Sequence, residues 1–501
     1  MSQALAISLT FPRGVYSGAV LGIAEDVPEH ARVHEAFVAA AAGGPTANEE
    51  GNVLVATDEH RRAVEWLEET EPLGVIVPPT ASTTHAARRY RWRASPVAPA
   101  DTDFEPFSAL AGPVVYLWPA APDGVVESLR EIALEVTHVG RADSIVIVGV
   151  GHREVADGPG VLRVAAGRGT GRVMRIPRAG RCEALVSAHA AANRPGRHGT
   201  GSLGRQASDE MITGANDEAV ELRRFAPTGA ASDWPFSEVW QLSIEGRTDV
   251  RQEIAQPANS IAAAVALHRA LIRAIGEDVP PFVTGRDGDS PLRGAGHLAI
   301  HLRPAANGHG PVVLLAIPDG TSDADREQLA LAVRTPLRAG ARLGRRKTRW
   351  FTASSPTLRS AAPFWPDGSP ILRTAVPLVV EVNGGPRRGN WTLDDAVVCS
   401  VGFALRGLLE RQGIEWGSGW KFRSELVRRL REEHGVDARA SRVRERSSRF
   451  VHRAREDDLI VAADALVDLG DLAPPDGAGF LALGRARHLG GGLLVPCEVG
   501  A

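Results

Sequence analysis

The chain has 501 residues, 44% of them hydrophobic, and a formal net charge of -3. This length exceeds what one hydrophobic core usually organises, so two or three domains are expected. No apolar span approaches the roughly 18 residues of a membrane helix, and the three distant cysteines fit neither a disulfide framework nor a zinc site. The composition therefore excludes a membrane protein and predicts a cytoplasmic protein without a metal or cofactor.

The first half alternates strand and helix patterns joined by long irregular segments. Apolar periodicity predicts strands at residues 4–11, 74–77, 113–118 and 144–150, and helices at 58–69 and 124–136. Residues 152–235 are rich in Gly, Arg, Ala and Pro, and residues 196–204 are expected to be a mobile loop. We place the boundary between two domains at 234/235.

The second half shows a clearer order of elements. A strand at 237–245 precedes an alanine-rich helix at 259–275, which Gly276 ends. Strands at 297–303 and 312–317, joined by a turn at 307–310, precede a helix at 322–333. A further strand near Trp350 would complete a ferredoxin-like β-α-β-β-α-β unit. A helix at 395–413 and two last strands predict a second, partial copy.

A basic glycine loop lies between the last two predicted strands. It runs Gly484-Arg485-Ala486-Arg487-His488-Leu489-Gly490-Gly491-Gly492. Glycines allow backbone amides to come close to a ligand, and arginines bind phosphate oxygens with charge-assisted hydrogen bonds. The loop has neither a Gly-Lys-Ser/Thr ending nor a following helix, so the mononucleotide and dinucleotide motifs do not fit. It indicates either an RNA-binding loop or a hairpin with a solvated tip.

Arginine dominates the basic residues. Of 57 lysines and arginines only Lys347 and Lys421 are lysines. This bias suits bidentate phosphate contacts, although a GC-rich genome would produce it as well. Lys347 and Arg349 belong to a basic cluster before Trp350, a pattern that fits RNA binding or a solvated basic surface.

Several segments, in order along almost the whole chain, carry a resemblance to a known family. They are Leu9-Thr10-Phe11-Pro12-Arg13-Gly14-Val15-Tyr16, residues 63–68, Pro113-Val114-Val115-Tyr116-Leu117-Trp118, residues 137–144 and 175–180, Val283-Thr284-Gly285-Arg286-Asp287 and residues 483–492. Together they resemble the fused repeat-RNA-processing protein of type I-G (formerly I-U) CRISPR systems. That family joins a subunit holding the 5′ end of the guide RNA to a repeat endoribonuclease.

The resemblance implies an α+β fold of ferredoxin-like (RRM-type) units, one in the N-terminal half and two in tandem in the C-terminal half. Residues 1–234 would bind the 5′ handle of the guide RNA, and residues 235–501 would be the repeat endoribonuclease. The expected partners are CRISPR repeat RNA, the mature guide RNA and other subunits of a type I effector complex. Gly484, Arg485, Arg487, Gly490, Gly492, Lys347 and Arg349 are the expected RNA-binding residues.

The implied reaction is metal-independent: the ribose 2′-hydroxyl attacks its own 3′-phosphate and leaves a cyclic phosphate. Such a reaction needs an acid or base near neutral pH and donors for the phosphorane charge, so histidine and arginine are the residues to seek. Tyrosine is excluded from the second half, because all three tyrosines precede residue 117. His297, His301 and His488 are the catalytic candidates. His268, on the predicted helix, is a rival.

Two classes of function remain open. The family pattern has a histidine in the strand after the hairpin, where this chain has Val312-Val313-Leu314-Leu315. The alternative to an endoribonuclease is therefore a noncatalytic RNA-binding subunit. Histidines within hydrogen-bond reach of the glycine loop would favour the enzyme, and scattered histidines the subunit. A small-molecule enzyme has little support, because no nucleophile elbow, metal set or nucleotide loop occurs.

Overall fold

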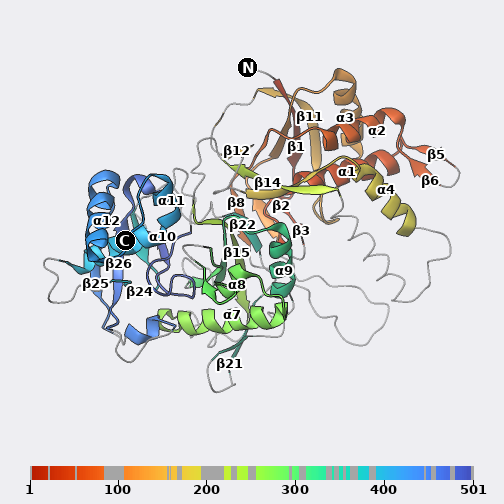
Figure 1. Ribbon diagram of the computed structural model, residues 1–501. Coiled ribbons are helices and arrows are strands. Elements are labelled where there is room, and N and C mark those ends of the chain that lie inside the picture. Colours follow the sequence, from red (N-terminus) through yellow and green to blue (C-terminus); the bar gives the residue numbers. More distant parts are fainter. Residues whose placement is uncertain are drawn as a thin grey trace. The chain divides into compact units, whose positions relative to one another are not determined.

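A computed structural model gives the chain an α+β fold of helices and antiparallel sheets. The residues that the structure describes are 3–20, 23–50, 53–83, 107–154, 157, 160–165, 172–192, 219–226, 234–245, 256–292, 296–303, 312–334, 341–343, 349–353, 357–360, 371–382, 391–444, 447–452, 459–473 and 480–497. The chain forms two compact units: the first contains most residues up to Thr228, and the second contains the residues from Gly229 onward together with two short earlier segments (Figure 1). Within the described residues no helix is long and apolar enough to cross a bilayer.

The N-terminal unit is built on a seven-stranded sheet of order β11-β1-β10-β7-β12-β14-β13. The helices of the unit and the strands of this sheet are β1 (Gln3–Thr10), α1 (His30–Gly43), α2 (Asp58–Glu69), β7 (Gly74–Ile76), β10 (Val114–Trp118), α3 (Asp123–Glu135), β11 (Ile147–Glu154), β12 (Val161–Val164), β13 (Arg172–Pro177), α4 (Arg181–Ala192) and β14 (Val220–Ala226). β1 lies between β10 and β11 and is antiparallel to both. All six elements predicted in this half are confirmed.

Strand β1 shows why this sheet forms. Its residues alternate between two faces, as strand geometry requires. Leu5, Ile7 and Leu9 belong to the large core that α1, α2 and α3 cover. Ala6, on the opposite face, packs with Val115 in a separate small cluster.

Helix α1 was not predicted, and its buried face explains why. Histidines occupy two positions of that face: His30 is fully buried and His34 is 1% exposed. Because histidine counts as polar, these residues interrupt the apolar stripe by which a helix is recognised. The ring of His30 stacks on that of Phe225, with centroids 4.8 Å apart and planes at 14°.

The first module of the C-terminal unit comprises residues 234–360. Its main elements are β15 (Phe236–Glu245), α7 (Ser260–Ile275), α8 (Pro281–Thr284), β18 (Ala299–Arg303), β19 (Val312–Pro318), α9 (Asp323–Arg334), β20 (Ala341–Leu343), β21 (Arg349–Ala353) and β22 (Thr357–Ser360). Within this module β18, β19, β15 and β22 lie side by side in that order as part of an eight-stranded sheet, and the pairs among them are antiparallel. The strand expected near Trp350 is β21. Only its last two residues pair with β15, and β22 pairs with more residues of the same edge of β15.

The second module comprises residues 371–497. Its elements are β23 (Ile371–Thr374), β24 (Leu378–Val379), α10 (Leu393–Ala404), α11 (Arg406–Arg411), α12 (Gly419–His434), β25 (Asp437–Arg442), β26 (Ala462–Asp468), η5 (Gly470–Leu472) and β27 (Leu494–Pro496). β23 lies between β27 and β26, and β25 pairs with β26. The helix predicted at 395–413 is present as α10 and α11. Helix α12 was missed because its charges are the solvated face of a helix, with Arg429 paired to Glu433.

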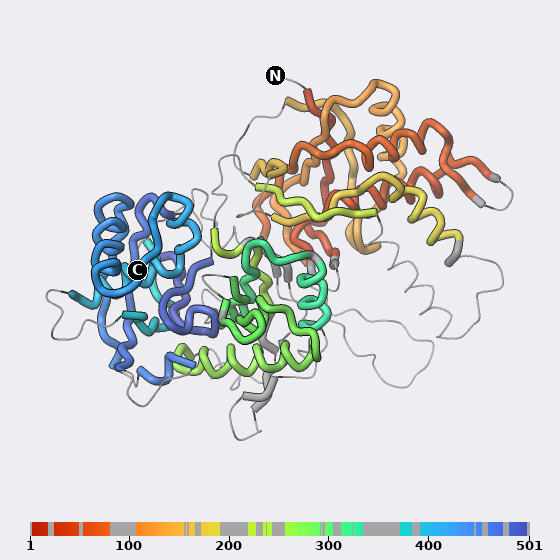
Figure 2. Tube along the Cα trace, in the orientation of Figure 1, coloured from red at the N-terminus to blue at the C-terminus, as the bar shows by residue number. Residues whose placement is uncertain are grey.

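The two modules pack against each other through the faces of their sheets that the helices leave open. One cluster joins Val239, Ala299 and Leu314 of the first sheet to Val379 of β24 and to Phe480. Separate cores lie between each sheet and its own helices. Figure 2 shows the result, with the dark-blue end of the chain beside the green residues of the first module.

Replacing His30 by Phe should reduce the loss of stability on acidification. Burial lowers the pKa of His30 to about 3, so the unfolded chain takes up a proton first. The free energy of unfolding therefore falls as pH drops from about 6.5 toward 3, by up to about 1.4 kcal/mol per pH unit. Urea unfolding at pH 7 and pH 5 measures this slope. His152→Phe, at an exposed position of β11, is the control, and a wild-type slope in His30→Phe would contradict the argument.

Candidate functional site

The glycine loop, Gly484–Gly492, is the closed end of a hairpin. The amide of Leu483 donates to the carbonyl of Gly492 at 2.9 Å, and that of Leu494 to Leu481 at 3.0 Å. Ala482 and Leu493 form an antiparallel bridge between these two bonds. The predicted position of the loop between two extended segments is confirmed.

The loop glycines bring the backbone close to the protein itself. Gly484, Gly490 and Gly492 have φ angles of 87°, 85° and 67°, a region that side chains disfavour. A Cβ atom would lie 2.3 Å from the carbonyl oxygen of Val379 at Gly484, 2.6 Å from that of Ser260 at Gly490, and 1.9 Å from that of Leu483 at Gly492. These contacts account for the glycines without a ligand.

Most amides of the loop already donate hydrogen bonds to carbonyls of the protein itself. The amide of Arg485 donates to the carbonyl of Val379 at 2.9 Å, and that of Gly492 to Pro377 at 3.2 Å. The amides of Arg487, Leu489 and Gly491 bond to carbonyls within the loop. The expectation that glycine would free amides for a ligand therefore fails at these five positions. The loop would therefore contact a ligand through its side chains more than through these amides.

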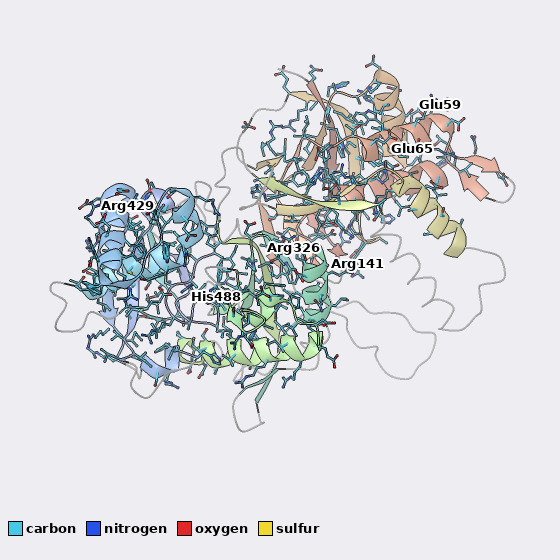
Figure 3. All side chains as sticks on the ribbon, viewed as in Figure 1. Glu59, Glu65, Arg141, Arg326, Arg429 and His488 are labelled. Atoms are coloured by element: carbon cyan, nitrogen blue, oxygen red, sulfur yellow. The ribbon has the colours of Figure 1, made fainter. Side chains whose placement is uncertain are left out.

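The loop is fixed to the first module by backbone bonds. The amide of Ile300 in β18 donates to the carbonyl of His488 at 2.9 Å, and Ile300 forms a parallel bridge with Leu489. At the first turn of α7, the hydroxyl of Ser260 donates to the carbonyl of Gly490 at 2.8 Å. His488, labelled in Figure 3, is thereby held beside the start of β18.

The three histidines predicted to be catalytic meet at this loop. The rings of His297 and His488 stack with centroids 4.6 Å apart and planes at 24°. Nε2 of His301 donates to the carbonyl of Arg487 at 2.8 Å. The rival, His268, lies on α7 and donates through Nε2 to the carbonyl of Val283 at 2.6 Å. His297 and His301 therefore both lie at the loop, and His301 is within hydrogen-bond reach of its backbone.

Hydrogen bonds define the tautomer of His297. Because a carbonyl only accepts, the 2.8 Å bond to Leu292 requires the proton on Nε2 and leaves Nδ1 as the acceptor. A Cβ atom on Gly285 would lie 2.7 Å from that Nδ1, so glycine is needed there. Gly285 belongs to the Val283–Asp287 segment that carried the resemblance. Sequence reasoning did not connect the two residues.

All four histidines are held neutral. Burial lowers the pKa of His297 and of His268, and lowers that of His301, which has no exposed surface, to about 4. The pKa of His488 falls well below its usual value, first through burial and then through Arg487. Both ring nitrogens of His488 are buried and form no hydrogen bond of full geometry within the described part of the chain, although the backbone of His297 lies close enough to act on the ring. A buried polar group without a full hydrogen bond is uncommon in proteins.

The predicted arginines differ in their surroundings. Arg487 is 20% exposed, and its Nη1 forms an ion pair with Glu381 and also contacts the carbonyl of Gly484 at 3.4 Å. Arg485 is exposed. Lys347 lies outside the described residues, and Arg349 begins β21, where side chains are not described.

Glu381 is a site residue that sequence reasoning missed. It is the single charge in the apolar run Val376-Pro377-Leu378-Val379-Val380-Glu381-Val382. A lone carboxylate in such a run indicates a buried partner, because an unpaired charge in a core is costly. That signal predicts a basic partner for Glu381 but does not identify it.

The described residues contain no group of three or more His, Cys, Asp or Glu side chains arranged to hold a metal ion.

Comparison with known proteins gives little further information. No family model and no curated protein matches this chain. Among solved structures, one described as structure A of CRISPR endoribonuclease Cse3 bound to 19 nt RNA matches at 17% identity. The match covers 52% of this chain and all of that one, with a TM-score of 0.20. A structural similarity this weak supports no inference about this chain. The class that the structure itself defines is a two-unit α+β protein with a histidine-bearing glycine loop.

Replacing Gly492 by Ala should destabilise the loop. The left-handed backbone alone costs about 1–2 kcal/mol for a non-glycine residue, and the 1.9 Å approach to the Leu483 carbonyl adds to it. Differential scanning calorimetry of the full chain would show a lower Tm. The control is Gly407→Ala in α11, where the nearest atom to a Cβ is 3.9 Å away and helix propensity favours alanine. Equal Tm values for the two variants would contradict this account.

Proposed function

We propose that the chain is a metal-independent endoribonuclease that cuts CRISPR repeat RNA and retains the mature guide RNA within a type I effector complex. The observation that carries this proposal is the meeting of His297 and His488 beside Arg487. These residues lie on the two segments, near Val283–Asp287 and in the glycine loop, where the resemblance places them.

The order of elements supports ferredoxin-like units. In the N-terminal unit, β1, β7, β10 and β11 are the first to fourth strands, and their order in the sheet is fourth-first-third-second. In the first module, β15, β18, β19 and β22 follow the same order. In the second, β23, β25, β26 and β27 do so as well. We assign one unit to residues 1–234, which would bind the 5′ handle, and two tandem units to residues 235–501.

The glycine loop occupies a specific place in this scheme. Between β26 and β27, where a ferredoxin-like unit has its second helix, the described residues contain η5 and the hairpin that bears the loop. RNA-binding folds of this kind use exposed side chains and positive charge to hold single strands. The loop supplies both through Arg485 and Arg487.

The chemistry divides among these residues. Nδ1 of His297 takes the proton from the ribose 2′-hydroxyl, and the resulting oxyanion attacks the adjacent phosphorus. The bond to the 5′-oxygen breaks, leaving a cyclic phosphate, and the 5′-oxygen receives a proton from water. Because the ring of His488 is held neutral, we assign it a hydrogen bond to the phosphate through its N–H. The guanidinium of Arg487 stabilises the phosphorane charge. His301 is buried and bonded to the loop backbone, so we assign it a positioning role.

His297→Ala is expected to slow cleavage by roughly 100-fold or more, the usual contribution of a general base, with little change in RNA affinity. The assay uses a labelled repeat transcript in EDTA. The matched control is His152→Ala, an exposed histidine of β11. A 2′-deoxy nucleotide at the cut should abolish cleavage and preserve binding. Equal cleavage by wild type and His297→Ala would remove His297 from the mechanism.

The pH profile supplies a second readout. Because burial lowers the pKa of His297, it stays unprotonated at mildly acidic pH, and the acid limb of kcat/KM should have its midpoint below 6.5. A midpoint at or above 6.5 would point to another base.

A noncatalytic RNA-binding subunit of the same complex is the second candidate. The observation that favours it is the burial of His301 and His488, which keeps both neutral and limits proton transfer. Tight binding of the repeat by wild type without a cut would establish this alternative. Absence of both binding and cleavage would overturn the assignment to RNA.

A further inference from the structure

Glu381 and Arg487 form an ion pair whose geometry leaves half of the guanidinium available. Nη1 of Arg487 contacts the carboxylate and the carbonyl of Gly484. Within the described residues Nε and Nη2 have no hydrogen-bond partner. A guanidinium presents five N–H donors in a rigid fork, so the Nε and Nη2 edge can still bind a phosphate through two parallel bonds.

Glu381 is surrounded mainly by positive charge. Its side chain is 16% exposed, and its Oε2 atom is buried without a hydrogen bond in the described part of the chain. Burial raises the pKa of this carboxyl, and Arg487, Arg485 and Arg423 act in the opposite direction. The strongest charges acting on this carboxyl are therefore positive, and the ion pair that it forms in the described part of the chain is with Arg487.

Backbone bonds hold the segments that carry Glu381 and Arg487 together. Glu381 lies two residues after β24, and the amide of Arg485 in the loop donates to the carbonyl of Val379, the last residue of that strand. The amide of Gly492 donates to the carbonyl of Pro377, just before the strand. The glutamate side chain has fewer rotatable bonds than the arginine side chain, so Glu381 can fix the orientation of Arg487 more readily than the reverse.

We propose that Glu381 is a positioning residue of a phosphate-binding site: it holds Nη1 of Arg487 so that the Nε and Nη2 edge meets a backbone phosphate of RNA. This inference rests on the proposed function in taking RNA as the ligand. It adds Glu381 to the site and gives Arg487 a defined edge of contact.

Paired variants of Glu381 test the proposal through RNA affinity and its salt dependence. Glu381→Ala removes the acceptor, and affinity for a labelled repeat RNA should fall roughly tenfold, as for Arg487→Ala. The slope of log K against log salt should decrease by about one in both variants. Glu381→Gln keeps an acceptor oxygen for Nη1 and should retain affinity within about twofold. The double variant Glu381→Ala/Arg487→Ala should bind no more weakly than Arg487→Ala.

Glu433→Ala is the matched control, because it removes a carboxylate paired with Arg429 on the exposed side of α12 and changes the net charge equally. Its affinity and salt slope should match those of the wild type. Thermal unfolding of each variant, followed by circular dichroism, verifies that the chain is folded.

Other outcomes overturn the inference. Tighter binding by both Glu381→Ala and Glu381→Gln would show that the carboxylate competes with the phosphate. Unchanged affinity in folded Glu381→Ala would show a purely structural pair. In either case wild type still binds RNA, so the proposed function stands. Failure of wild type to bind repeat RNA would instead overturn the proposed function.

Discussion

The backbone bonds that the glycine loop makes with both modules of the C-terminal unit are the constraint on which the candidate site depends. The loop must approach the carbonyls of Val379 and Ser260 so closely that only glycine fits at Gly484 and Gly490. That approach places the carbonyl of His488 on the amide of Ile300 and stacks the ring of His488 on that of His297. The stack of His488 on His297 and the bond of His301 to the carbonyl of Arg487 would both be lost if the loop moved by a few ångström.

In both units, buried charged side chains are bonded to a second side chain. In the N-terminal unit, Nε of Arg175 donates to Glu29 at 2.6 Å, and Glu25 accepts from the hydroxyl of Tyr16 at 2.6 Å. In the C-terminal unit, Arg487 pairs with Glu381. Removing one member of such a pair leaves an unpaired buried charge, which costs far more than the pair contributes to stability. These pairs therefore fix the positions of their side chains more than they raise the free energy of unfolding. At the glycine loop the side chain fixed in this way is Arg487, which we propose binds RNA.

The sequence predicted the elements better than their contacts. Strand β1 and helix α2 follow clear periodicities, and Thr57 accepts from the amide of His60 as an N-cap should. Periodicity did not reveal α1, because His30 lies on its buried face. His297, His301 and His488 were chosen from their places in the chain, but their burial and lowered pKa values depend on residues nearly two hundred positions away. Glu381 was missed for the same reason: its partner is not a neighbour in sequence.

The long separation between contacting residues also determines when the site can form. His301 bonds to a residue 186 positions later in the chain, and Ser260 to one 230 positions later. Contacts this distant close late in folding, because local structure forms first. Without the hairpin, Ile300 in the edge strand β18 lacks its bond to the loop. An edge strand that is left uncovered can pair with other chains. A fragment ending before residue 480 would therefore aggregate readily. The stack of His297 on His488 needs both modules in place, so its presence reports complete folding of the C-terminal unit.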